Sequence, residues 1–142
     1  MNILKFFTPK SALSYLYDTY TLRQAMEKME NSRYTAIPVI DKRNRYVGTL
    51  TEGDILWYIK SLDISCLKDA ENYYIKDIEP HLNYLPVRID ADLHDVVVTS
   101  LEQNFVPVVD DRDKFIGIVT RKKIIQYFLA RQEEKILQKA EV

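Results

Sequence analysis

The chain has 142 residues, 46% of them hydrophobic, and a net charge of -1. A chain of this size can bury about two thirds of the surface of its unfolded state, so a disordered tail is excluded. Its near-neutral net charge argues against a protein that binds nucleic acid through a large positive charge. A single cysteine, Cys66, excludes an internal disulfide and a Cys-x-x-Cys metal site. The sequence shows no leader pattern and no run of about 18 apolar residues. We therefore expect a cytoplasmic protein with no membrane or nucleic-acid partner.

The first half of the chain predicts a helix, two strands and a second helix. Apolar residues recur at helical spacing over positions 22–29. AIPVI (36–40) has the pattern of a buried strand that ends in the turn residues DKRN, and RYVGTL (45–50) returns as a second strand. Thr51 then stands at a helix N-cap, where its hydroxyl can accept a hydrogen bond from a free backbone N–H.

The second half of the chain repeats this order. A shift of 69 positions places IPVIDKRNRYVGTLTEGDILWYI (37–59) on VPVVDDRDKFIGIVTRKKIIQYF (106–128) without a gap, and 8 of 23 positions are identical. Apolar residues at helical spacing also precede the second copy: Leu93, Val96, Val97 and Leu101. Each unit is too small to hide its own sheet face, so we expect an α+β fold in which the two units pack around a pseudo-twofold axis and leave symmetry-related clefts.

YTAIPVIDKRNRYVGTLTEGDI and FVPVVDDRDKFIGIVTRKKI share a turn of the form h-P-V-x-D, where h is apolar, and a helix start with glycine three positions before threonine. The first segment also has the aspartate that completes the form G-h-h-T-x-x-D. These segments resemble the two halves of a tandem CBS-domain pair, or Bateman module, and the resemblance covers nearly the whole chain. It implies two β-α-β-β-α repeats, adenine nucleotides bound in the clefts between them, and a homodimer. The implied division is 1–62 for the first repeat (motif core 34–59), 63–84 for a linker and lead-in segment, 85–131 for the second repeat (motif core 103–128) and 132–142 for a C-terminal helical tail.

The two motifs differ in completeness. Thr51 at a helix N-terminus can bind a phosphate, and Asp54 resembles the family carboxylate that accepts from both ribose hydroxyls. The same Thr-x-x-Asp spacing is also that of a capping box, so both interpretations stay open. In the second motif Lys123 stands in place of the aspartate and Phe105 in place of Ala36. We therefore expect the second site to be empty or weak.

Three cations, Arg121, Lys122 and Lys123, follow Thr120 at an expected helix N-terminus, where the helix dipole disfavours them. Arg121 and Lys122 become favourable if a nucleotide phosphate lies among them in a cleft shared with the first motif. The alternative is an ordinary run of solvated charges. On the first interpretation, removing both side chains abolishes nucleotide binding; on either, it slightly stabilises the unliganded fold.

The choice of nucleotide follows from the resemblance. Small stand-alone CBS proteins of Gram-positive bacteria that bind cyclic di-AMP are similar at the positions Thr35, Ala36, Thr120, Arg121 and Lys122. Ala36, followed by Ile37, leaves room for an adenine, Tyr34 would cover its face, and Ser14 would form the other wall. Two phosphodiester charges suit one Arg–Lys pair, which favours cyclic di-AMP and leaves AMP, ADP and ATP open.

The sequence gives little support for catalysis, a cofactor or a metal. His81 and His94 have no repeated Cys, Ser or carboxylate arrangement near them, so we expect them to be surface residues. We therefore expect a regulatory protein that is not an enzyme and acts by changing its contact with an unidentified protein. Ile136 and Leu137 offer apolar contacts to a dimer mate or target, with a frayed charged tail as the alternative. A dimerising adaptor that binds no ligand is the second hypothesis.

Overall fold

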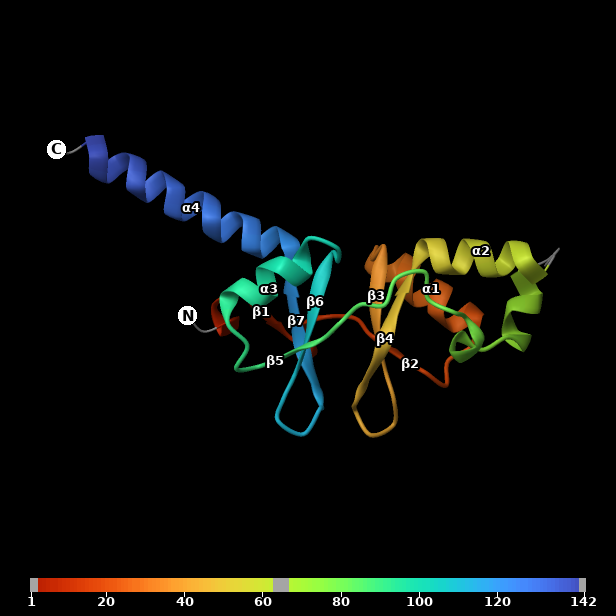
Figure 1. Ribbon diagram of the computed structural model, residues 1–142. Coiled ribbons are helices and arrows are strands. Elements are labelled where there is room, and N and C mark those ends of the chain that lie inside the picture. Colours follow the sequence, from red (N-terminus) through yellow and green to blue (C-terminus); the bar gives the residue numbers. More distant parts are fainter. Residues whose placement is uncertain (1–2, 63–66, 141–142) are drawn as a thin grey trace.

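The computed structural model describes residues 3–62 and 67–140 and contains two α/β units side by side (Figure 1). The first unit contains β2 (Leu16–Tyr17), α1 (Leu22–Ser32), β3 (Ala36–Ile40), β4 (Tyr46–Thr51) and α2 (Glu52–Leu62). The second contains β5 (Val87–Arg88), α3 (Leu93–Ser100), β6 (Phe105–Val109), β7 (Phe115–Thr120) and α4 (Arg121–Ala140). Both units therefore have the expected β-α-β-β-α order. The connection between them holds two 3-10 helices, η3 (Leu67–Asn72) and η4 (Ile75–Asp77), while Cys66 and the other linker residues in 63–66 lie outside the described residues.

Side chains that satisfy free backbone N–H groups fix where the helices begin. Thr21 forms a capping box with Gln24 at the start of α1, and Asp92 accepts from the backbone N–H of Asp95 at the start of α3. The C-cap of α1 is Arg33, in the left-handed conformation with φ 58°. This left-handed cap ends α1 sharply and leads the chain into β3.

The two sheets differ in their number of strands. The first has the order β2-β3-β4, and the second has the order β1-β7-β6-β5, with β1 at Phe7–Pro9. In both, the short strand that opens the repeat, β2 or β5, runs parallel to β3 or β6, and the hairpin that follows is antiparallel. Thus β1, which precedes the first repeat in the chain, pairs antiparallel with β7 of the second, Thr8 lying opposite Ile118. The range 1–62, assigned to the first repeat from the sequence, therefore includes a strand that completes the other sheet.

A glycine permits this extra strand. At Gly117, which lies opposite Pro9 in the β1–β7 ladder, an added Cβ would collide with the Thr8 carbonyl and the Phe7 ring. At the corresponding position in the first sheet, Gly48, an added Cβ would have open space. The close approach of β1 thus depends on the missing side chain at position 117.

Three apolar clusters form the core. One lies inside each unit, and the third joins the units through buried residues of both: Ala36, Ile40, Tyr84, Phe105, Phe115 and Ile118. The two hairpins also meet, because the Phe115 backbone N–H donates to the Asn44 carbonyl at 2.8 Å. The two units therefore pack against each other as expected.

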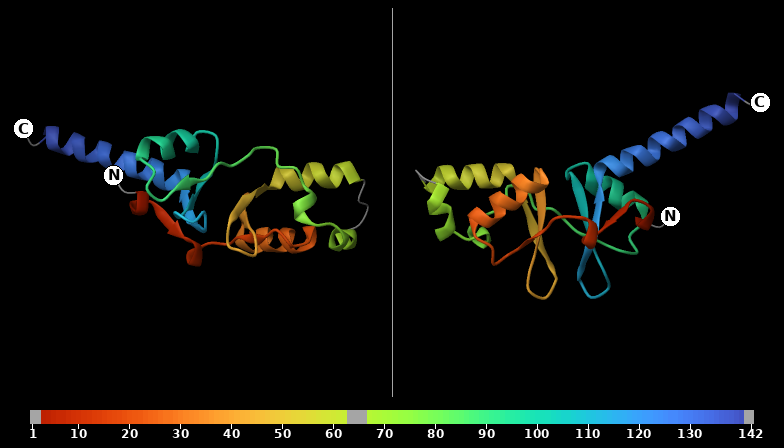
Figure 2. Two further views of the ribbon diagram at one scale, coloured as in Figure 1. Left: turned by 60° about the horizontal axis from the view of Figure 1, so that its bottom comes forward. Right: turned by 180° about the vertical axis from the view of Figure 1, so that it is seen from behind.

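The last helix, α4, begins against β7 and α3, and its C-terminal half extends away from both units (Figure 1, and both views of Figure 2). Residues 132–140 of the expected C-terminal helical tail continue this helix, and 141–142 lie outside the described residues. Within 3–62 and 67–140, no helix combines the length and the apolar character needed to cross a bilayer.

Candidate functional site

Asp54 is the best-defined polar group of the first motif. It lies in the first turn of α2 with only 3% of its surface exposed. Its Oδ2 accepts from the Thr51 backbone N–H at 2.9 Å, and its own N–H donates to Thr51 Oγ1 at 3.1 Å. The capping box that the sequence left open is therefore formed.

The other carboxylate oxygen of Asp54 also has a backbone partner. The His81 backbone N–H donates to Asp54 Oδ1 at 2.7 Å. This bond attaches the connection between the repeats to the start of α2. His81 itself is exposed, as is His94, in agreement with the prediction for both histidines. Thr51 and Asp54 can still meet a ligand at this helix N-terminus, but a ribose would have to share or displace the His81 N–H.

Two adjoining hollows lie in this region, and the first of them is lined by Asp54. The first, of about 530 Å³, is lined by Asp54, Trp57, Tyr58, Asp77, Ile78, Glu79, Pro80 and His81. The second, of about 240 Å³, is lined mainly by apolar residues of β3, β4 and the η4 region, and it shares Ile78 and Pro80 with the first. An apolar slot beside a few convergent polar groups is the usual form of a small-molecule site. Ile78, Pro80 and His81 were missed by the sequence analysis, since they belong to the connection between the repeats, which carries no motif.

The predicted adenine wall is assembled in part. Tyr34 Oη accepts from the Ser14 backbone N–H at 3.3 Å, so these two residues are in contact, and neither lines the hollows beside α2. Their role as the two walls of an adenine pocket stays a prediction. Ala36 pairs with Thr51 across β3 and β4, and Ile37 beside it is fully buried. The Thr35 carbonyl accepts from the Glu52 N–H at 3.0 Å, which fixes the start of α2 against β3.

The buried Tyr84 and the partly buried Tyr46 close the region between the two sheets. Tyr46 Oη bonds Thr49 Oγ1 at 2.7 Å and donates to the Tyr84 carbonyl at 3.1 Å. Burial raises the pKa of the Tyr46 phenol well above its usual value. Among the described residues, every buried side-chain polar atom has a hydrogen-bond partner. The protein therefore satisfies this interior without a ligand.

The second motif is filled by side chains. Phe105 is 5% exposed, and its ring centroid lies 5.2 Å from that of Tyr84. Thr120 Oγ1 accepts from the Lys123 N–H at 3.2 Å, and Lys123 Nζ donates to Thr8 Oγ1 at 2.7 Å. Thr120 is therefore an N-cap without a carboxylate partner at position 123. This arrangement supports the prediction of an empty second site, which stays a prediction.

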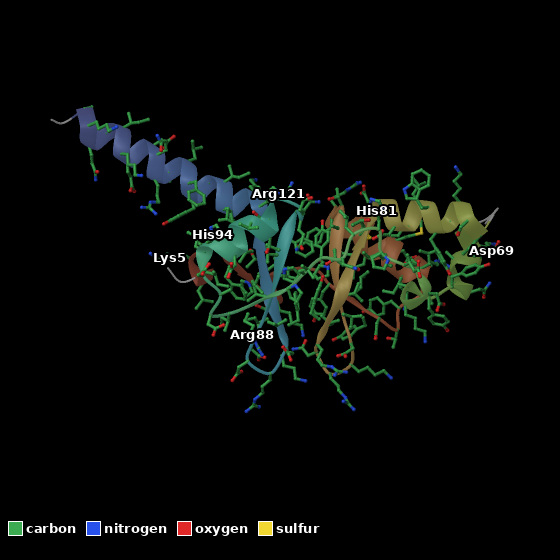
Figure 3. All side chains as sticks on the ribbon, in the orientation of Figure 1. Lys5, Asp69, His81, Arg88, His94 and Arg121 are labelled. Carbon is green, nitrogen blue, oxygen red and sulfur yellow. The ribbon has the colours of Figure 1, made fainter. Side chains whose placement is uncertain are left out.

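Arg121 points away from the first motif. Its Nε donates to the Ser100 carbonyl at 2.8 Å and its Nη2 to the Leu101 carbonyl at 3.4 Å. Both carbonyls lie at the C-terminus of α3, where the helix dipole favours a cation. In Figure 3, Arg121 and His81 are labelled on different units. The Arg121 side chain is thus bonded to α3 in this structure and Lys122 is exposed, and the expected contact of both with a nucleotide stays a prediction.

Comparison with known proteins agrees with this architecture. The sequence profile of the family described as CBS domain matches residues 9–61 and 75–130. A CBS domain protein from Streptococcus pneumoniae TIGR4 has a TM-score of 0.82 and 29% identity, with 91% of this chain and 87% of that chain covered. Arabidopsis thaliana CBSX2 in complex with AMP has a TM-score of 0.73 and 26% identity, with 92% and 98% covered. Listeria monocytogenes CbpB in complex with c-di-AMP has a TM-score of 0.77 and 20% identity, with 92% and 97% covered.

The curated relatives are longer, and the chain spans between 20% and 64% of their lengths. The match of the family profile nevertheless covers both repeats, including the two Gly-h-h-Thr helix starts. The likeness to the solved structures extends over at least 91% of the chain in the three cases above. This chain belongs to the CBS domain family, as a tandem pair of CBS repeats.

Proposed function

We propose that this protein is a regulatory CBS pair that binds an adenine nucleotide, preferably cyclic di-AMP, beside Asp54. The observation that carries the proposal is the buried Asp54 carboxylate at the N-terminus of α2, next to the apolar hollow under η4. A flat base suits the apolar hollow, a ribose suits the carboxylate, and a phosphate suits the helix N-terminus. The complexes of CBSX2 with AMP and of CbpB with c-di-AMP support the choice of ligand class.

Binding in this position is coupled to the connection between the repeats. Ribose hydroxyls donate to a carboxylate, and Asp54 Oδ1 already accepts from the His81 N–H. A nucleotide therefore competes with His81 for the same oxygen. A ligand changes a protein only if it binds two conformations with different affinities. Here the two conformations would differ in the position of residues 79–85.

Two cations, Arg121 and Lys122, are predicted to contact the phosphate groups, and they differ in their present contacts. Lys122 is exposed, whereas Arg121 must leave the Ser100 carbonyl before it can contact a ligand. We infer that Lys122 makes the first phosphate contact and that Arg121 contributes only after its side chain has turned away from α3.

The output is a changed contact with another protein, in a cytoplasmic molecule that is not an enzyme. A non-liganded adaptor is the alternative, and it is favoured by one observation: both oxygens of Asp54 are satisfied within the chain. An AMP, ADP or ATP sensor is a variant of the first proposal with another ligand.

Isothermal titration of nucleotide-stripped protein with cyclic di-AMP, AMP, ADP and ATP at one salt concentration separates these cases. We expect saturable binding, tightest for cyclic di-AMP, and faster amide exchange at His81 in the complex by hydrogen-exchange mass spectrometry. Tighter binding of a mononucleotide makes the protein an energy sensor. Absence of binding by all four compounds refutes the proposal and leaves the adaptor.

A further inference from the structure

The hollow of about 530 Å³ beside Asp54 has an acidic and aromatic lining that the proposed nucleotide leaves unexplained. Two lining residues, Asp77 and Glu79, are exposed carboxylates, and Trp57 and Tyr58 supply an aromatic wall. Among the described residues, no lysine or arginine lines this hollow. These two carboxylates and two rings are called here the anionic pocket. Its negative charge repels a phosphate and attracts a cation.

The carboxylates of the anionic pocket are not engaged by cations of their own chain. Within residues 3–62 and 67–140, neither Asp77 nor Glu79 forms an ion pair. Burial and the nearby Asp77 carboxylate raise the pKa of the Tyr58 phenol, so negative charge lies close to this ring. A cation that enters the pocket would therefore meet two carboxylates that have no competing partner.

The aromatic wall also favours a cation. Lys60 Nζ lies 5.4 Å from the centroid of the Trp57 ring, although Lys60 does not line the hollow. The face of an indole attracts a positive charge more strongly than that of any other side chain. A guanidinium is flat, so it can stack on such a ring while its N–H groups donate to a carboxylate. An arginine side chain thus matches both the ring and the carboxylates.

The second repeat shows what covers the corresponding ring when the chain supplies its own cation. The shift of 69 positions places Tyr58 on Tyr127 and Leu62 on Arg131. The Arg131 guanidinium lies 5.7 Å from the centroid of the Tyr127 ring, and its Nη1 donates to Tyr127 Oη at 3.1 Å. In the first repeat, the residue in the place of this arginine is a leucine.

A second cation of the other repeat also has a counterpart in the hollow. The shift of 69 positions places Asp54 on Lys123, and a shift of 71 positions, which places β2 on β5, sets Thr8 on Glu79. Lys123 Nζ donates to Thr8 Oγ1 at 2.7 Å. The second repeat therefore holds an ammonium and a guanidinium in a region where the first repeat has carboxylates and no cation of its own.

We propose that the anionic pocket binds an arginine side chain from a basic segment of another protein. The guanidinium stacks on Trp57 and pairs with the carboxylates of Asp77 and Glu79. Just beyond His81, Leu82 is 48% exposed and Leu85 is 63% exposed. These leucines offer apolar contacts to the residues that flank the arginine, which favours a protein segment over a small free cation.

This contact names the chemistry of the partner through which a regulatory protein of this kind would act. Glu79 belongs to residues 79–85, whose position a nucleotide is proposed to change. The link between nucleotide and partner therefore rests on the proposed function. The anionic pocket itself is formed in the unliganded chain, so its binding of arginine is tested without a nucleotide.

Trp57 is the only tryptophan of the chain, so its fluorescence reports binding at the anionic pocket. We expect the nucleotide-free protein to show a saturable change with the capped peptide Leu-Ala-Arg-Ala-Leu and none with the peptide in which citrulline, a neutral isostere, replaces arginine. Asp77→Asn combined with Glu79→Gln should weaken peptide binding about tenfold, since two ion pairs are lost. Glu133→Gln combined with Glu134→Gln, on the outer half of α4, is the matched control and should leave the affinity unchanged.

Leu62→Arg provides a second test, because it copies the cation of the other repeat. An arginine four residues after Tyr58 should cover that ring and compete with the peptide, whereas Leu62→Gln should compete much less. Circular dichroism and urea unfolding check that each variant is folded.

Three results would overturn the proposal. They are equal binding of the arginine and citrulline peptides, an unchanged affinity in the Asp77→Asn and Glu79→Gln double variant, and binding of acetyl-arginine amide as tight as that of the whole peptide, which would indicate a small cationic ligand. Peptide binding by a protein that binds none of the four nucleotides refutes only the proposed function. Nucleotide binding without peptide binding refutes only the arginine contact.

Discussion

Arg121 and Lys122 are adjacent cations, and the structure predicts opposite effects on stability when each is replaced by alanine. Both lie in the first turn of α4, where the helix dipole disfavours a positive charge by about 0.3–1 kcal/mol. From the sequence alone, loss of both side chains was expected to stabilise the unliganded fold slightly. For Lys122, which is exposed, this stays a prediction, but for Arg121 it omits the contacts that the side chain makes with α3.

The magnitude follows from those contacts. The Arg121 guanidinium donates to the Ser100 carbonyl at 2.8 Å, a bond with a charged donor that is typically worth about 1.5–3 kcal/mol. The second bond, to the Leu101 carbonyl at 3.4 Å, is near the limit for a hydrogen bond and adds little. The favourable dipole at the end of α3 offsets the adverse dipole of α4. With partial solvent exposure, we expect Arg121→Ala to lower the free energy of unfolding by about 1–2 kcal/mol.

Urea unfolding of Arg121→Ala, Lys122→Ala and Arg121→Met at one protein concentration measures these effects. Lys122→Ala should raise the free energy of unfolding by a few tenths of a kcal/mol, with an unchanged slope in urea. Arg121→Met keeps an aliphatic stem between α3 and α4 and should be destabilised nearly as much as Arg121→Ala, because the hydrogen bond is lost in both. If Arg121→Ala is as stable as the wild type or more stable, the assignment of Arg121 to the end of α3 is refuted.

Three further outcomes follow from single contacts. Asp54→Asn leaves either the Thr51 or the His81 N–H facing an amide N–H, so urea unfolding should show a loss of about 1–3 kcal/mol, and an unchanged stability would contradict the bonding at Asp54. Gly117→Ala pushes β1 from β7 and should lower stability by about 1–3 kcal/mol, whereas Gly48→Ala, with open space at its position, should not; equal effects would contradict the β1–β7 pairing. Burial raises the pKa of Tyr46 in the folded state, so the folded protein holds this proton where the unfolded chain releases it, and stability should fall as pH rises above about 10. Tyr46→Phe should show a shallower fall in pH-dependent urea unfolding, and an identical fall would refute this origin.

The repeat and most of its elements were predictable from local pattern. Buried strands with turn residues after them and threonines at helix starts are signals within a few residues, and they gave β3, β4, β6, β7 and the N-termini of α2 and α4. The internal repeat then indicated how the two units pair. The observed β-α-β-β-α order of both units confirms the predicted repeat.

The features that were missed depend on partners distant in the chain. β1 has only three residues, and its pairing with β7 joins Phe7 to Val119, so no local pattern indicates it. Gly117 is no signal of it either, because its positive φ already favours glycine within the hairpin and its counterpart Gly48 is a glycine with open space beside it. The direction of Arg121 is set by carbonyls at Ser100 and Leu101, and backbone acceptors have no sequence signature.

The hydrogen bond from the His81 N–H to Asp54 also joins residues that are distant in the chain, and it changes how the candidate site is understood. A Thr-x-x-Asp helix start appears from sequence as a choice between a capping box and a ribose contact. In the structure the box uses Oδ2 and leaves Oδ1 to a backbone donor in the connection between the repeats. The two roles therefore use different oxygens of one carboxylate, and the box can persist while Oδ1 changes partner.

Because the capping box uses only Oδ2, the free-energy cost of a nucleotide response depends on replacing the His81 N–H at Oδ1. His81 is exposed, so water can satisfy its N–H after a ribose displaces it, and the exchange requires little free energy. The same stretch of chain continues to Tyr84, which is buried against Phe105 in the cluster that joins the two units. A movement that starts at His81 therefore meets tight packing within three residues, where small shifts require the neighbouring side chains to repack. Because Phe105 fills the second motif, that repacking can start only from the first motif, so a nucleotide response in this protein is expected to be asymmetric between its two repeats.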